Sequence, residues 1–199
     1  MTLRSRPSQS QADPSAQSPA IHGTKGLECL VESVNESWDN YIPLTNPRPQ
    51  PDYAVRFKST AFTEDQLKKI QLFIGSFKEV SFFIGTYYIY FPFLACEVKC
   101  SAADLDITDR QNAYSITIAI RGVVELFRLM KRENELYWEI LAFSLSHDHL
   151  TVRIYGYYPI IDGSNTTFYR YPIYIFDFTT MDSKEKWRVY KFTKNVYKI

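Results

Sequence analysis

Two opposite charges stand two residues apart at the end of a strongly apolar stretch. The stretch YFPFLACEVKC covers residues 90–100, and its charged residues are Glu97 and Lys99. Successive side chains of a strand point to opposite faces, so Glu97 and Lys99 share one face of an extended segment. Such a pair is either an ordinary ion pair on a solvated strand, or a metal-binding carboxylate beside a catalytic ammonium. The spacing leaves both interpretations open.

The chain has the size and composition of one globular domain. It has 199 residues, of which 45% are hydrophobic, and its 15 tyrosines and 14 phenylalanines favour a sheet-rich core. The formal net charge is +1, so any nucleic-acid partner must be held by a local patch and not by a global field. Three cysteines, with no signal-peptide pattern and no membrane-length apolar stretch, predict a reduced, intracellular protein, cytoplasmic or nuclear, without a membrane partner.

The first fifty residues contain three stretches of different composition. Residues 1–24 are rich in Ser, Gln, Pro and Ala and predict a disordered tail, which leaves 25–199 as the folded domain. Apolar residues at helical spacing predict a first helix over 26–39. Four prolines between residues 43 and 51 then force an extended connector.

The remaining sequence alternates between strand and helix patterns. The expected elements are a strand over 53–57, a helix from the N-cap Thr63 to Gly75, strand material over 80–100, a long helix over 106–133, and strands over 137–147, 150–160, 166–178 and 186–199. Turn signals stand between the last strands at DGSN and MDSKE.

Several of these segments together resemble a known superfamily. Pro51-Asp52 followed by Glu97-Val98-Lys99 resembles the signature of the PD-(D/E)XK nucleases. The segments YFPFLACEVKC, DRQNAYSITIAIRGVVELFRL, SHDHLTVRIYGYYPIIDG and KFTKNVY are similar to an uncharacterised nuclease-like domain family of filamentous fungi, from about residue 28 onward. The resemblance implies an α/β fold of restriction-endonuclease-like type, with a central mixed sheet flanked by helices.

The resemblance also implies a site and a chemistry. Asp52 and Glu97 would hold Mg²⁺ or Mn²⁺ together with the carbonyl of Val98, because hard divalent cations take oxygen ligands. Lys99 would be the catalytic cation that orients the attacking water or stabilises charge on the phosphate. Gln111 falls where many members carry a glutamine that contacts the site.

Three other carboxylates compete for a place in this site. Glu79 is the rival of Asp52 for the first carboxylate, since many members space the two motifs more closely than these 45 residues. Glu32 or Glu36 could add a carboxylate from the expected first helix. The implied function is hydrolysis of nucleic-acid phosphodiesters. The alternative is a catalytically inactive binding or interaction module, of effector or selfish-element type.

Two further groups of residues admit a binding interpretation. The segment KEKWRVYKF places Lys186, Arg188 and Lys191 among aromatic residues, which suits phosphates and stacked bases, or equally an edge strand protected by lysines. His147 and His149 could share a metal, but a hairpin turn with solvated imidazoles is favoured because no third ligand stands nearby.

Overall fold

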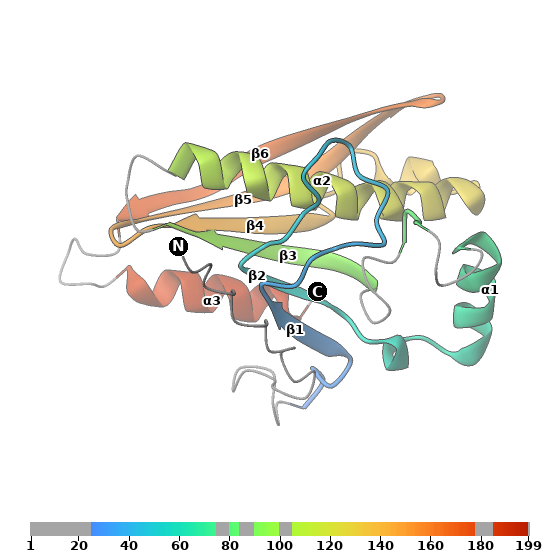
Figure 1. Cartoon of the computed structure of the whole chain (residues 1–199), viewed down its shortest axis with the longest axis horizontal. Coiled ribbons are helices and arrows are strands. Elements are labelled where there is room, and N and C mark those ends of the chain that lie inside the picture. Colours follow the sequence, from blue (N-terminus) through green and yellow to red (C-terminus); the bar gives the residue numbers. More distant parts are fainter. Residues whose placement is uncertain (1–24, 75–79, 84–89, 100–104, 178–184, 199) are drawn as a thin grey trace, which may run out of the picture.

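The structure is a computed structural model that describes residues 25–74, 80–83, 90–99, 105–177 and 185–198 (Figure 1). Its centre is one sheet whose strands lie side by side in chain order. They are β1 (Leu30–Val34), β2 (Tyr53–Phe57), β3 (Tyr90–Val98), β4 (Ala142–His147), β5 (Thr151–Asp162) and β6 (Asn165–Asp177). Neighbouring strands are antiparallel except β3 and β4, which are parallel. The expected mixed sheet is therefore confirmed.

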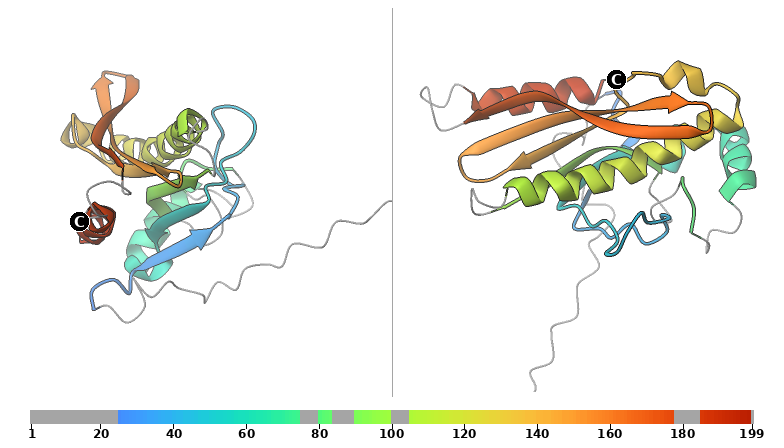
Figure 2. Two further views of the ribbon diagram at one scale, coloured as in Figure 1. Left: turned by 90° about the vertical axis from the view of Figure 1, so that its left-hand side faces the viewer. Right: turned by 90° about the horizontal axis from the view of Figure 1, so that it is seen from above.

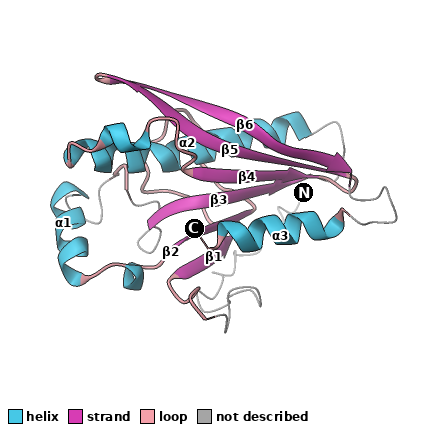
Figure 3. Ribbon diagram, turned by 180° about the vertical axis from the view of Figure 1, so that it is seen from behind, coloured by secondary structure: helices cyan, strands magenta, loops and turns pink. Residues whose placement is uncertain are grey.

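In the part of the chain that the structure describes, three α-helices pack against this sheet. They are α1 (Glu64–Ile74), α2 (Leu105–Leu129) and α3 (Lys186–Val196). The parallel pairing of β3 with β4 requires a crossover, and α2 supplies it. Figures 2 and 3 show α2 and α3 on opposite faces of the sheet, with α1 at one end. No helix among the described residues is long and apolar enough to cross a membrane.

Each face of the sheet has its own apolar core. Under α2, Ile116 and Ile120 pack with Ala95 and Ala142. On the other face, Val55, Leu94, Leu145 and Ile154 form a cluster that Val189 and Phe192 of α3 cover. The central strand β3 contributes to both clusters, so its residues are apolar on both faces.

The expected helix over 26–39 is wrong. Residues Leu30–Val34 form β1 instead, which pairs antiparallel with β2 from Leu30 opposite Phe57 to Val34 opposite Tyr53. The short apolar run fits either period, and backbone pairing with β2 decides in favour of the strand. Trp38, counted on the helical stripe, is instead buried against Tyr41 beyond the strand.

The expected strand over 186–199 is also wrong, because α3 occupies it. Its aromatic and β-branched residues suggest a strand, but Val189, Phe192 and Val196 also recur at helical spacing. Val189 and Phe192 pack on the sheet, and Val196 is buried. Tertiary packing therefore overrides local propensity here.

Other expectations are met within the described residues. Thr63 caps α1, since its Oγ1 accepts a hydrogen bond from the N–H of Gln66 at 3.2 Å. The long helix ends at Leu129, and Ile120 and Val124 on its stripe are both buried. The DGSN turn joins β5 to β6. The expected tail 1–24, the helix stop at Gly75 and most of MDSKE lie outside the described residues.

Candidate active site

Asp52 and Glu97 come together between two adjacent strands. The antiparallel register pairs Tyr53 of β2 with Cys96 of β3, which brings the preceding Asp52 opposite the following Glu97. The two carboxyl groups are close enough for Asp52 to raise the pKa of Glu97. Asp52 Oδ2 also accepts a hydrogen bond from the backbone N–H of Val98 at 2.7 Å. Residues 45 positions apart in the chain thus form a carboxylate pair.

The environment of Glu97 disfavours its charged form. Its side chain lies at the buried end of β3, where the residue is only 3% exposed. Burial, followed by the negative charge of Asp52, raises the pKa of Glu97 to about 7, while the Lys99 ammonium acts in the opposite direction. Glu97 therefore binds a proton near neutral pH, and a cation between the two groups would relieve their repulsion.

Lys99 completes this group just beyond the end of β3. Its backbone N–H donates to the carbonyl of His147 at 3.0 Å, which continues the pairing of β3 with β4 past the last strand residue. Its ammonium is close enough to Glu97 to oppose the rise of the carboxyl pKa. We call Asp52, Glu97 and Lys99 the carboxylate site.

A layer of buried polar residues continues from the carboxylate site beneath α2. On the helix these residues are Thr108, Asp109, Asn112 and Ser115, and on the sheet they are Glu97, Ser144 and Ser146. The register places Ser146 beside Glu97 on one side and opposite Arg153 on the other. Arg153 in turn forms an ion pair with Asp109 at 2.8 Å. The sheet end that carries Glu97 is therefore polar across three strands.

Of this layer, sequence reasoning named only Glu97, and Asn112 is one of the residues that it missed. Gln111, the expected contact, is exposed, whereas its neighbour Asn112 is fully buried. Asn112 Nδ2 donates to the carbonyl of Leu145 at 2.8 Å and to Ser146 Oγ at 2.9 Å. Position 112 lies one helical turn before Ile116, so the helical period alone places Asn112 on the buried stripe of the helix.

The additional carboxylates have other partners or cannot be placed. Glu32 on β1 accepts hydrogen bonds from the hydroxyls of Tyr53 and Tyr197. Tyr53 shares a face with its partner Cys96, so this group lies on the opposite face from Glu97. Glu36 forms an ion pair with the buried Arg56 at 2.8 Å. Glu79 lies outside the described residues.

A family model matches residues 13–199, nearly the whole chain, and its description is "Domain of unknown function (DUF7924)". The chain belongs to this family. No curated protein and no solved structure matches it. Membership of the DUF7924 family carries no statement about activity, so the chemistry must be argued from the carboxylate site.

The basic segment of the DUF7924 domain is helical, and one of its cations, Arg188, already has partners within the protein. Arg188 forms an ion pair with Glu185 at 2.5 Å and lies over the Tyr174 ring, 5.3 Å from its centroid. Lys191 is exposed, and Lys186 begins the helix. The interpretation as an edge strand protected by lysines is wrong, because β1 and β6 are the edge strands and this segment is α3.

The remaining candidate metal ligands of the DUF7924 domain stand apart. His147 ends β4 and His149 is exposed in the turn to β5, so the expected hairpin is confirmed. Burial, with the charges of Asp52 and Glu97, raises the pKa of the Cys96 thiol to about 12, which makes it a poor metal ligand. In the described part of the chain, no three His, Cys, Asp or Glu residues cluster around one metal position. Asp52 and Glu97 thus form a two-carboxylate site.

Proposed function

We propose that this DUF7924 protein is a divalent-metal-dependent nuclease of PD-(D/E)XK type that hydrolyses nucleic-acid phosphodiesters. The observation that carries the proposal is the pairing of Asp52 with the buried Glu97, whose pKa is raised to about 7. A carboxyl group whose pKa is shifted by burial and by a neighbouring carboxylate is typical of sites that bind a cation or move a proton. Lys99 on the same side supplies the cation that phosphate chemistry needs.

The donor set suits Mg²⁺ or Mn²⁺. Asp52 and Glu97 offer hard carboxylate oxygens, and the carbonyl of Val98 would add a third oxygen, with water completing the shell. The bound metal would supply a nucleophile from water and a clamp on a phosphate oxygen. Asp52 is held by the Val98 N–H, so its orientation is fixed before the ion arrives. The Lys99 ammonium would hold the attacking water or the phosphate.

The order of elements supports the same function. Pro51-Asp52 precedes β2, Glu97-Val98-Lys99 ends the neighbouring β3, and α2 follows across one face of the sheet. This arrangement resembles the PD-(D/E)XK pattern, in which both motifs lie on central strands of a mixed sheet. Register, and not sequence spacing, makes Asp52 the preferred first carboxylate.

A nucleic-acid substrate is favoured by the position of α3. Figure 1 shows that α3 begins at the same end of the sheet at which β3 and β4 end, although α3 covers the face opposite to that of Glu97. Arg188 and Lys191 lie on α3 with Trp187 and Tyr190, which are 57% and 54% exposed. Exposed cations and aromatic rings suit phosphates and bases. Such an enzyme would act in the cytoplasm or nucleus.

The test is metal-dependent cleavage of labelled single- and double-stranded DNA and RNA. With Mg²⁺ or Mn²⁺ we expect cleavage that EDTA stops, and a loss of at least about 100-fold in Glu97→Gln and Lys99→Ala. Glu139→Gln, at an exposed position before β4, is the matched control and should keep full activity. Cleavage that persists unchanged in Glu97→Gln would exclude the proposed site.

The same proteins and substrates test the alternative, an inactive nuclease-derived module. It predicts that nucleic acid binds without cleavage at any metal concentration, and that Glu97→Gln binds as well as the original protein. Binding would then fall only when α3 is altered, for example by Lys191→Glu.

A further inference from the structure

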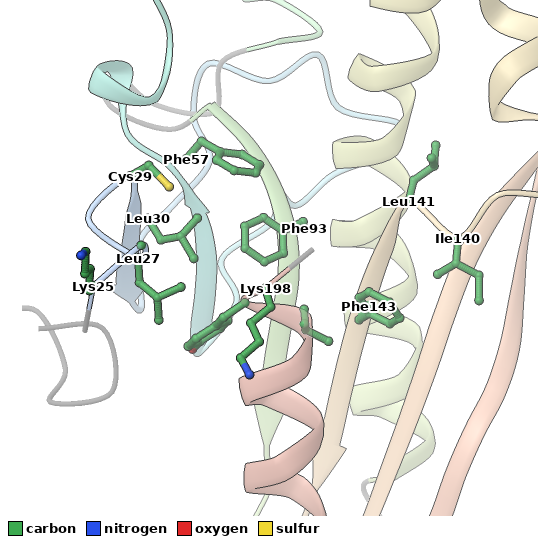
Figure 4. Close-up of a pocket in the computed structure, with 13 residues that line it drawn as sticks. Lys25, Leu27, Cys29, Leu30, Phe57, Phe93, Ile140, Leu141, Phe143 and Lys198 are labelled. Carbon is green, nitrogen blue, oxygen red and sulfur yellow. The ribbon is translucent and has the colours of Figure 1, made fainter. Parts of the chain in front are cut away.

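An apolar cavity of about 530 Å³ lies on the sheet face that α3 covers (Figure 4). Its walls come from the segment before β1, from β2 and β3, from the residues that lead into β4, and from the end of α3. Glu97 shares the α2 face with Ala95, so the cavity and the carboxylate site lie on opposite faces of the sheet. The cavity is therefore a second, separate candidate site.

The cavity exists because α3 is short relative to the sheet. Its 11 residues span about 16 Å, and they cover only part of the face. Phe57, Phe93 and Phe143 line the cavity and remain half-buried, although they point toward the domain interior. Partial exposure of these apolar side chains to water is unfavourable, and an apolar ligand would remove that cost.

The charged side chains that line the cavity in the described part of the chain have one sign. Among the described residues that line it, the charged side chains are Lys25 and Lys198, and no Asp or Glu is present. Figure 4 shows these two lysines on separate segments, one before β1 and one after α3. A ligand that fits this arrangement has an apolar body and an anionic end.

We propose that this cavity binds a free linear aliphatic monocarboxylate of medium to long chain, that is, a fatty acid. Its volume lies within the range of about 300–1,000 Å³ that is typical of small-molecule sites. The Phe57 and Phe93 rings are inclined at 43° with centroids 5.2 Å apart, so they do not form the parallel walls that a rigid planar ligand needs. A flexible chain adapts to such walls, while its carboxylate pairs with Lys25 and Lys198 at the rim. The proposal is independent of the nuclease function.

The test is calorimetric titration of the full chain with octanoate, decanoate and dodecanoate below their micelle concentrations. We expect one saturable site and an affinity that rises about fourfold per added methylene until the cavity is full. The double variant Lys25→Glu and Lys198→Glu should bind dodecanoate at least about tenfold more weakly, while neutral dodecanol is unaffected. Lys194→Glu is the matched control, because Lys194 is exposed on α3, just before Lys198, and does not line the cavity.

A second variant tests the cavity without changing its charge. Ile140 lines the cavity and is 43% exposed, so Ile140→Trp should obstruct it and abolish binding while the melting temperature stays near that of the original protein. Absence of saturable binding, equal affinity for dodecanol and dodecanoate, or unchanged binding in either cavity variant would overturn the proposal. Glu97→Gln should bind dodecanoate normally, which separates this outcome from failure of the nuclease proposal.

Discussion

Asp52 Oδ2 accepts a hydrogen bond at 2.7 Å from the backbone N–H of Val98, on the strand that carries the second carboxylate. This bond ties the residue before β2 to the end of β3. A shift of the register by one residue would turn Glu97 to the other face of the sheet and separate the pair. The chemistry of the carboxylate site therefore depends on correct pairing of β2 with β3.

Divalent cations should stabilise the folded protein. Mg²⁺ or Mn²⁺ would relieve the repulsion between Asp52 and Glu97, so the melting temperature should rise with metal concentration, by about 2.7 kcal/mol of stability at a hundredfold excess over Kd. Glu97→Gln should lose this shift, and Lys99→Ala should keep it. Scanning fluorimetry at matched ionic strength measures both, with Glu139→Gln as the control. An equal metal response in Glu97→Gln would show that the ion binds elsewhere.

Stability without metal should depend on pH through Glu97. Its pKa is raised from 4.5 to about 7 on folding, so between these values the folded state binds more protons than the unfolded state. The contribution of this carboxyl to stability is thus fully present below about pH 4.5 and is lost as the pH rises through 7. In EDTA, Glu97→Gln should be more stable than the original protein at pH 8, and the difference should shrink toward pH 5.

The metal response should have the opposite pH dependence. Metal must displace the proton that Glu97 binds, so the metal-induced rise in melting temperature should be larger at pH 8 than at pH 5.5. A rise that is the same at both values would mean that Glu97 is not a ligand.

The sequence predicts best where one period dominates over a long segment. The stripe of α2 runs for many turns and fixes both the helix and its buried face, including Ile120 and Val124. β1 and α3 were misassigned because a short run such as Leu30–Val34 or Lys186–Val196 satisfies both the strand and the helix period. In each case a distant partner, β2 or the open face of the sheet, decides the conformation.

The prediction of the carboxylate site was likewise limited by contacts between residues that are distant in the sequence. Glu97 and Lys99 could be proposed from alternation within one strand, since their relation is local. The choice of Asp52 as partner required the register between β2 and β3, which local spacing does not determine. The helical period places Asn112 on the buried stripe of α2, but its partners, Ser146 and the Leu145 carbonyl, are distant in the sequence and become known only from the structure.

The ion pair in the polar layer should contribute strongly to stability. Asp109 is buried, and its Oδ2 accepts hydrogen bonds from Arg153 at 2.8 Å and from Tyr155 at 3.0 Å. Arg153→Leu leaves a buried carboxylate without its cation, which should cost about 3–5 kcal/mol in chemical denaturation. The exposed pair of Arg132 with Glu135 is the control, and Arg132→Leu should cost at most about 1 kcal/mol.

Removing both members of the buried pair should be less harmful than removing one. The double variant Arg153→Leu and Asp109→Leu leaves no uncompensated buried charge, because the other partner of Arg153, Asp106, is exposed, so it should recover much of the stability lost in Arg153→Leu. A double variant that is less stable than the single one would mean that Asp109 matters mainly through Tyr155 and not through Arg153.

Gly122 in the middle of α2 should not tolerate a methyl group. Alanine is normally more favourable than glycine inside a helix by about 1 kcal/mol. Here a Cβ would lie 2.2 Å from the carbonyl oxygen of Phe82, so the backbone of residues 82–83 would have to move away from the helix. Gly122→Ala should therefore lower the melting temperature by several degrees, whereas Thr117→Ala, at a half-buried position of the same helix, should not. A rise in the melting temperature of Gly122→Ala would show that the segment at Phe82 does not pack on α2 at this position.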